Sequence, residues 1–226
     1  MSYTRQQLRD LCRRRLGDET VPYKWSDLQV NQWINDAIAD YSVHFPRTIT
    51  LKIDCTAGTH YYNLPLDFKN MLSVEYPKGE DPPEFLTLSD RLLPEFFESD
   101  TFYCVESSID AVTAGLLWIS ADPTVTEDIN IIYQGDHAYL DDDADVVTVI
   151  DRHLELIMLY VRWAAFQELA TTESSNPDPT SLALSTLELN AYRAQRLYYQ
   201  SMNDAEKAES RSATAQWTMD KWDRSY

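Results

Sequence analysis

Glycine and cysteine are scarce in this 226-residue chain, and each shortage excludes a class of function. The five glycines are isolated from one another, which excludes a Walker phosphate loop and a dinucleotide-binding fingerprint. Cys12, Cys55 and Cys104 are odd in number and widely spaced, so we expect free thiols in a reducing compartment. The sequence has no CxxC or HExxH pattern, and no two of its four histidines have metal-ligand spacing. We therefore expect neither a cofactor nor a metal-dependent enzyme.

Long apolar runs are also missing. The longest, Leu156 to Val161, is far too short to cross a bilayer, and the N-terminus lacks the apolar segment of a signal peptide. We therefore expect a protein that is made in the cytoplasm and has no membrane partner. What the chain does have is 44% hydrophobic and 12% aromatic residues, which is enough to bury a sizeable core.

Basic side chains are outnumbered, with 19 Lys and Arg against 37 Asp and Glu, which gives a formal net charge of −18. Most of the excess lies between residues 51 and 150, which hold 4 basic and 20 acidic side chains. A protein this acidic repels the phosphate backbone, so sequence-reading DNA binding is not expected. The acidic loop Asp136 to Asp145 has two interpretations, a site for a hard cation or a solvated loop before a helix. The many acids also leave open a carboxylate pair of the kind that glycosidases use.

One basic run stands out, at Arg13, Arg14 and Arg15. Successive helical residues point about 100° apart, so these arginines cannot form one flat patch. One interpretation is a solvated helix end, where positive charge suits the helix dipole. The other is a contact with an acidic partner or with passing DNA.

Hydrophobic periodicity predicts the order of the elements. Capping boxes at Thr4/Gln7 and Ser26/Gln29 predict helices to about Leu16 and to Pro46. Alternation then predicts a hairpin of two strands, 47–54 and 60–64, joined by the turn 56–59. A helix at about 151–172 is apolar nearly all round, so we expect neighbours on several sides, including other copies. Asp178 and Pro179 predict the start of a fourth helix. Further strands are predicted at 71–76, 101–105, 116–120 and 129–134, with a short helix at 89–97.

These elements predict an α+β fold. Residues 1–46 and 148–202 would form an antiparallel bundle of about four helices, and residues 47–147 an inserted small antiparallel β module with the acidic loop. Residues 203–226 would form an extended C-terminal tail. The tail is polar apart from a few large apolar side chains, which are the type that concentrates interface energy. We expect it to dock on a partner, although packing on its own bundle is the alternative. The predicted anchors are Trp217, Met219, Trp222 and Tyr226.

Two stretches together resemble a known family. WSDLQVNQWINDAIADYSVHFP (Trp25–Pro46) followed by TAGTHYYNLPLDFKNMLSVEY (Thr56–Tyr76) is similar to the head-to-tail connector, or adaptor, proteins of short-tailed bacteriophages. In that family a tryptophan and an asparagine of the second helix precede a strand and a turn, after which a tyrosine, Leu-Pro and Asp-Phe follow. The matching positions here are Trp33, Asn35, Ala57-Gly58-Thr59, Tyr62, Leu64-Pro65 and Asp67-Phe68.

The resemblance implies a structural virion protein of the phage neck, not an enzyme. It implies a ring, usually of twelve copies, that joins the portal protein to the tail nozzle or tube protein, with DNA passing through the bore without sequence-specific binding. It also implies a C-terminal extension that grips the portal. The alternatives are another neck component, such as a stopper or tail-completion protein, and a cell-wall-degrading glycosidase.

Overall fold

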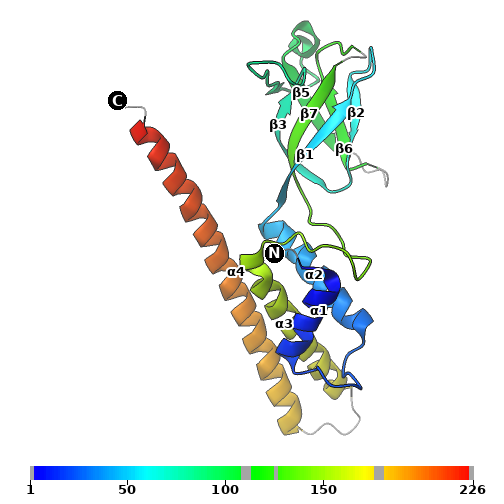
Figure 1. The fold of residues 1–226 in the computed structure, drawn as a ribbon, viewed down its shortest axis with the longest axis vertical. Helices are drawn as coiled ribbons and strands as arrows, with labels where there is room; N and C mark the ends of the chain where they lie inside the picture. The colour runs from blue at the N-terminus through cyan, green and yellow to red at the C-terminus, as the bar shows by residue number, and fades with distance from the viewer. Residues whose placement is uncertain (1–2, 108–112, 125–126, 176–180, 224–226) are drawn as a thin grey trace. The chain divides into compact units, whose positions relative to one another are not determined.

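The computed structural model describes the backbone of residues 3–107, 113–124, 127–175 and 181–223, and side chains in these ranges except 181–183 and 211–223 (Figure 1). The chain divides into two compact units. The helical unit consists of Met1–His44 and Ala138–Tyr226, and the β unit consists of Phe45–His137. The fold is therefore α+β, with the β unit inserted between two parts of the helical unit.

The helical unit contains α1 (Arg5–Leu16), α2 (Asp27–His44), the short 3₁₀ helix η2 (Asp151–His153), α3 (Leu154–Ser174) and α4 (Ser181–Asp223). Both predicted capping boxes are confirmed. The Thr4 N–H donates to Gln7 Oε1 at 3.0 Å, and the Ser26 N–H donates to Gln29 Oε1 at 3.0 Å. Gly17 then ends α1 in the left-handed conformation, with φ of 68°, which glycine adopts without strain.

Helix α3 is covered by its own chain. It packs against α1, α2 and α4, which explains why its apolar residues leave so little polar surface. The expectation that other copies are needed to cover α3 was therefore wrong for these side chains, because three helices of the same unit already do so. The buried residues of α3 are Leu154, Leu156, Ile157, Leu159, Val161 and Ala165.

Helix α4 is longer than the sequence pattern indicated. It has 43 residues, about 64 Å at 1.5 Å per residue, whereas the 21 residues of α3 span about 32 Å. Figure 1 shows α4 running back along α3, with the C-terminal part of α4 continuing past the start of α3. The expected extended segment from residue 203 is thus helical as far as Asp223. Asp178 and Pro179, the predicted start signal, lie outside the described residues.

The β unit is a sandwich of two sheets. Its strands are β1 (Arg47–Asp54), β2 (Tyr61–Leu64), β3 (Phe68–Glu75), β4 (Thr87–Leu88), β5 (Phe102–Ser107), β6 (Gly115–Ile119) and β7 (Asp128–Gly135), with the 3₁₀ helix η1 (Pro94–Glu98) before β5. One sheet has the order β1-β7-β3 and the other β2-β6-β5-β4. All strand pairs are antiparallel except β4 with β5.

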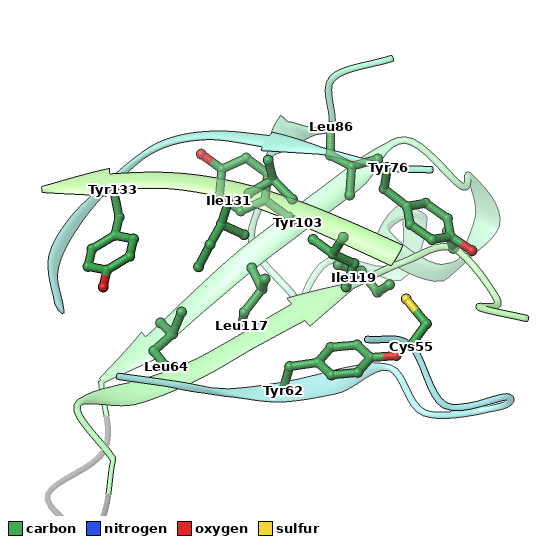
Figure 2. Packing of buried hydrophobic residues seen from close by; sticks show 13 residues of the cluster. Cys55, Tyr62, Leu64, Tyr76, Leu86, Tyr103, Leu117, Ile119, Ile131 and Tyr133 are labelled. Carbon is green, nitrogen blue, oxygen red and sulfur yellow. The ribbon is translucent and has the colours of Figure 1, made fainter. Parts of the chain in front are cut away.

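The predicted hairpin of residues 47–64 was wrong, because β1 and β2 lie in different sheets. β1 pairs with β7 over eight residues, from Arg47 opposite Gly135 to Asp54 opposite Asp128. β2 pairs instead with β6. The turn at Gly58 carries the chain from one sheet to the other, so that Cys55 and Tyr62 are both buried in the core between them (Figure 2).

Alternating residues of both sheets fill this core, as Figure 2 shows. Ile129 and Ile131 of β7 are fully buried, and Leu117 and Ile119 of β6 belong to the same cluster. Three residues from the family resemblance also have structural roles here. Tyr62 and Leu64 are buried in the cluster, and Phe68 packs on Tyr133 at 5.6 Å between ring centroids.

Asn35, another of those residues, ties the helical unit together. Its side-chain amide donates to the carbonyl of Leu140 at 3.1 Å, and its carbonyl accepts the Leu140 N–H at 3.0 Å. The amide is buried, so both of its hydrogen bonds replace bonds to water. Asn35 therefore holds against α2 the segment around Leu140, which follows the β unit in the chain.

Candidate interaction surfaces

Arg13 is an internal structural residue. Its side chain is only 4% exposed, and its guanidinium contacts the carboxylates of Asp18 and Asp27 at 2.6 Å each. It also donates to the carbonyl of Trp25 at 3.0 Å. These contacts join the end of α1 to the start of α2. The guanidinium of Arg13 is thus occupied within the chain.

Arg14 and Arg15 differ from Arg13, because their side chains are 66% and 57% exposed. Each has a surface partner, Glu19 at 3.3 Å for Arg14 and Glu155 at 2.7 Å for Arg15. Exposed pairs of this kind contribute little stability and exchange readily for other partners. The three arginines therefore do not form a common patch, and two of them are open to contacts from outside.

The acidic loop is held by arginines of α1. Both carboxylate oxygens of Asp143 accept hydrogen bonds from Arg9, at 2.8 and 2.9 Å, and Arg5 also contacts this carboxylate at 3.0 Å. The hydrogen bonds from Arg9 hold the pKa of Asp143 below its usual range. Among the described residues, no group of three or more His, Cys, Asp and Glu side chains is arranged to hold a metal ion.

Four described carboxyl groups and two buried thiols have a pKa that their surroundings clearly shift. A glycosidase needs a carboxyl group with a raised pKa as its general acid. The described carboxyl groups whose pKa is clearly shifted are all lowered instead: Asp54, Glu75, Glu127 and Asp143. Burial raises the pKa of the Cys12 thiol to about 12, and it also raises that of Cys55, so both thiols stay protonated and unreactive.

Two adjoining hollows border α4; the first lies between α3 and α4, and the second is lined by side chains of α4 alone. One has a volume of about 330 Å³ and is bordered by Trp163, Gln167 and Tyr192 among others. The second, of about 660 Å³, is bordered by Arg196, Tyr199 and Asn203 among others, and it shares Tyr192 and Gln195 with the first. The two hollows therefore continue one another along α4. We refer to them together as the α4 groove.

Three aromatic side chains, Trp163, Tyr192 and Tyr199, border the α4 groove among polar and small side chains. The side chains of Tyr192 and Tyr199 are 60% and 48% exposed, and Trp163 stacks on the buried Tyr198 with an interplanar angle of 24°. The periodic spacing of Leu187, Ala191, Ala194 and Tyr198 predicts one face of α4, of which Ala194 and Tyr198 are buried and Leu187 and Ala191 are partly buried. It missed the neighbouring groove, although Tyr192 and Tyr199 are seven residues apart, the spacing of one helix face.

The predicted C-terminal anchors are described only in part. Trp217, Met219 and Trp222 lie on the helical backbone of α4, and their side chains are outside the described part of the chain. Tyr226 lies outside the described residues altogether. No helix in the described ranges is both long enough and apolar enough to cross a membrane.

Exposed aromatic side chains such as Tyr192 and Tyr199 are typical of surfaces that bind other proteins. Comparison with protein families is more specific. The chain matches the family model of the SU10 adaptor protein over residues 3–220, and it belongs to that family. A comparison with curated proteins gives no match.

Membership confirms the resemblance to phage head-to-tail adaptors. It makes the chain a structural component of a bacteriophage virion, which associates with other virion parts such as the portal and the tail.

Proposed function

We propose that this protein is a head-to-tail adaptor that assembles into a ring, with twelve copies as its expected number, between the portal and the tail nozzle or tube. The observation that carries the proposal is the family match, which includes both parts of the helical unit and the whole β unit. Genomic DNA would pass through the bore of the ring. The chain's net charge of −18 keeps the phosphate backbone from adhering, which suits a passage rather than a binding site.

The α4 groove is our proposed contact between neighbouring copies in the ring. A ring needs a heterologous contact, in which one surface of each copy receives a different surface of the next. Exposed aromatic side chains in a hollow are the usual anchors of such a contact. Tyr192 and Tyr199 on the groove walls fit this role.

The C-terminal end of α4 is our proposed contact with the portal, through Trp217, Met219, Trp222 and Tyr226. Its support is the continuation of α4 well past α3, where the sequence is polar apart from these side chains. Arg14 and Arg15 are proposed as further contacts with an acidic partner or with DNA, whereas Arg13 is occupied internally.

The test is native mass spectrometry of the chain with and without its phage's portal protein. The wild-type chain should form a ring complex with the portal. Substituting both Trp217 and Trp222 by Ala should abolish portal binding, whereas Lys221→Ala, on the same helical segment, should not. If the tryptophan variant binds the portal as the wild type does, the proposed docking segment is wrong.

Ring formation is tested separately by Tyr192→Ala combined with Tyr199→Ala. This variant should remain monomeric, because the groove loses its two exposed tyrosine side chains. The matched control is Tyr139→Ala, since Tyr139 is 61% exposed but does not border the groove. A chain that binds tail protein but not portal would instead be a stopper or tail-completion protein.

A further inference from the structure

The β unit carries an unusual surface segment, Glu84–Glu98, which joins β3 to β5. Five large apolar side chains of this segment are at least half exposed, with Leu92 reaching 81%. Exposed apolar side chains are normal one at a time, but several within fifteen residues indicate a contact site. The five are Phe85, Leu88, Leu92, Leu93 and Phe97.

The segment is held rigidly by the sandwich beneath it. Between the exposed side chains, Leu86 and Phe96 point inward and are 8% and 0% exposed. The Leu86 N–H donates to Val74 in one sheet at 2.8 Å, whereas the Thr87 N–H donates to Thr101, beside β5 of the other sheet, at 2.7 Å. The segment therefore bridges the two sheets. The exposed apolar side chains therefore lie on a segment whose backbone is hydrogen-bonded to both sheets.

Negative charge surrounds these apolar side chains. Seven carboxyl groups between residues 80 and 100 are exposed, and no ion pair joins them to a Lys or Arg among the described residues. The one basic residue in this range, Arg91, contacts Glu106 at 2.6 Å and lies over the Trp118 ring at 4.3 Å. The seven are Glu80, Asp81, Glu84, Asp90, Glu95, Glu98 and Asp100.

Exposed apolar side chains surrounded by carboxylates favour a partner of positive charge. DNA and an anionic membrane surface are repelled by the carboxylates. A second copy of the chain, at −18, is also a poor electrostatic match. A basic protein that offers lysine or arginine around an apolar patch matches both features, because its cations pair with the rim while the leucine and phenylalanine side chains lose their water.

We propose that the segment Glu84–Glu98 is the docking surface of the β unit for a basic virion protein. Leu92, Leu93 and Phe97 are the apolar anchors. The carboxylates around them steer the partner into place. The proposal concerns a surface of the β unit alone and does not depend on whether the α4 groove closes a ring or the C-terminal segment binds the portal.

The test places a photocrosslinking amino acid at Leu92 in virions of the phage that encodes the chain, with Leu28 of the helical unit, 79% exposed, as the matched control position. Mass spectrometry of the adducts should identify a virion protein of net positive charge at Leu92 and not at Leu28. An adduct with another copy of this chain, with DNA or with an acidic protein would overturn the proposal. So would the absence of any adduct at Leu92 in complete virions.

Two variants then test the roles of the side chains. Their binding is measured with the virion protein that the crosslink identifies, purified on its own. Substituting Leu92 and Leu93 by Ser should weaken binding by roughly 30-fold, the loss typical of interface anchors. Substituting Glu95 and Glu98 by Gln should slow association and reduce its dependence on salt. Thermal unfolding should be unchanged in both variants, because all four side chains are exposed. If the serine variant is folded and still binds with wild-type affinity, Leu92 and Leu93 are not the apolar anchors.

Discussion

Arg13 illustrates how the surroundings of a charged side chain decide its role. It belongs to a run of three arginines, yet it alone is buried, against an Asp18 side chain that is only 6% exposed. The same Asp18 also accepts the N–H of Lys24 at 2.7 Å, so one carboxylate organises both the guanidinium and the loop before α2. A buried charge is tolerated only with such partners.

Removing that carboxylate gives the first prediction. Asp18→Ala leaves the buried guanidinium of Arg13 with Asp27 as its one remaining carboxylate, so the free energy of unfolding should fall by about 3 kcal/mol, the low end for breaking a buried pair. Urea unfolding followed by helical circular dichroism measures the loss. Glu19→Ala is the control, because Glu19 belongs to an exposed pair and should change stability by less than about 1 kcal/mol. Equal losses in the two variants would show that burial of the ion pair does not determine its contribution to the free energy of unfolding.

His153 gives a prediction about pH. Its imidazole is 6% exposed, and its Nδ1 lies 2.8 Å from the hydroxyl of Tyr41. Burial, followed by the nearby Arg152, lowers the pKa of His153, while Glu209 opposes this. The unfolded chain therefore takes up a proton near pH 6.5 that the folded chain resists. Stability is present above that pH and is lost as the pH falls towards the lowered pKa.

We therefore expect the wild type to unfold at lower urea concentration at about pH 5.5 than at about pH 7.5. His153→Gln removes this titration and should flatten the dependence in the helical signal. The pKa of His137 in the β unit is also lowered by burial and acts in the same direction, so His137→Gln separates the two units. A helical signal whose pH dependence survives in His153→Gln would rule out this histidine as its source.

At the scale of elements, the strand pairing in the β unit depends on one close backbone approach. Gly115 begins β6, where an added Cβ would lie 2.6 Å from the carbonyl oxygen of Glu106 in β5. No side chain fits at that distance from a backbone atom, so the strands would have to move apart. Glycine at this position permits the pairing of Ser107 with Gly115.

Gly115→Ala should therefore destabilise the β unit by about 1–3 kcal/mol, the usual cost of overpacking. Hydrogen exchange of the amides of β5 and β6 reports on this unit, whereas five of the six tryptophans of the chain lie outside it. Helical circular dichroism reports on the other unit. Ser107→Ala, directly opposite on β5 and exposed, is the control and should have little effect. A loss confined to the helical signal would contradict this account.

The sequence predicted elements that carry their own local signals. The starts of α1 and α2 have capping boxes, and β7 alternates so regularly that its strand was evident. The pairing of β1 with β7 was missed because nothing local records a partner eighty residues away. The end of α4 was missed because its polar sequence has no apolar stripe, and β4 is too short, at two residues, to show a pattern.

Interaction surfaces were harder to predict than the core. The sequence drew attention to Arg13, Arg14 and Arg15 as a group, but only the fold separates the buried one from the exposed two. The α4 groove and the segment Glu84–Glu98 were missed because exposure of an aromatic or leucine side chain is a property of the folded surface. Composition alone cannot distinguish Leu92, exposed to solvent, from Leu117, fully buried.

At the scale of the whole molecule, charge is distributed over both units. Residues 45–137 hold 5 basic and 16 acidic side chains, and the rest of the chain holds 14 and 21. Neither unit therefore offers a net positive surface to the other unit of a neighbouring copy. Any contact between copies has to be made by apolar and hydrogen-bonding groups, such as those of the α4 groove, against a repulsive background.

That repulsion makes the proposed ring dependent on salt. Twelve copies at −18 each would bring together a formal charge of −216. The Debye length is about 30 Å at 0.01 M salt and about 8 Å at physiological ionic strength, so added salt screens charges on adjacent copies from one another. Sedimentation velocity at about 0.01 M and about 0.15 M NaCl should therefore show monomer at the lower concentration and a larger share of rings at the higher. Sucrose at matched osmolarity is the control. Because it is uncharged and does not screen charges, it should not increase the share of rings. Complete rings at the lowest ionic strength would mean that the acidic side chains are paired or protonated between copies, and that the repulsion assumed here does not oppose assembly.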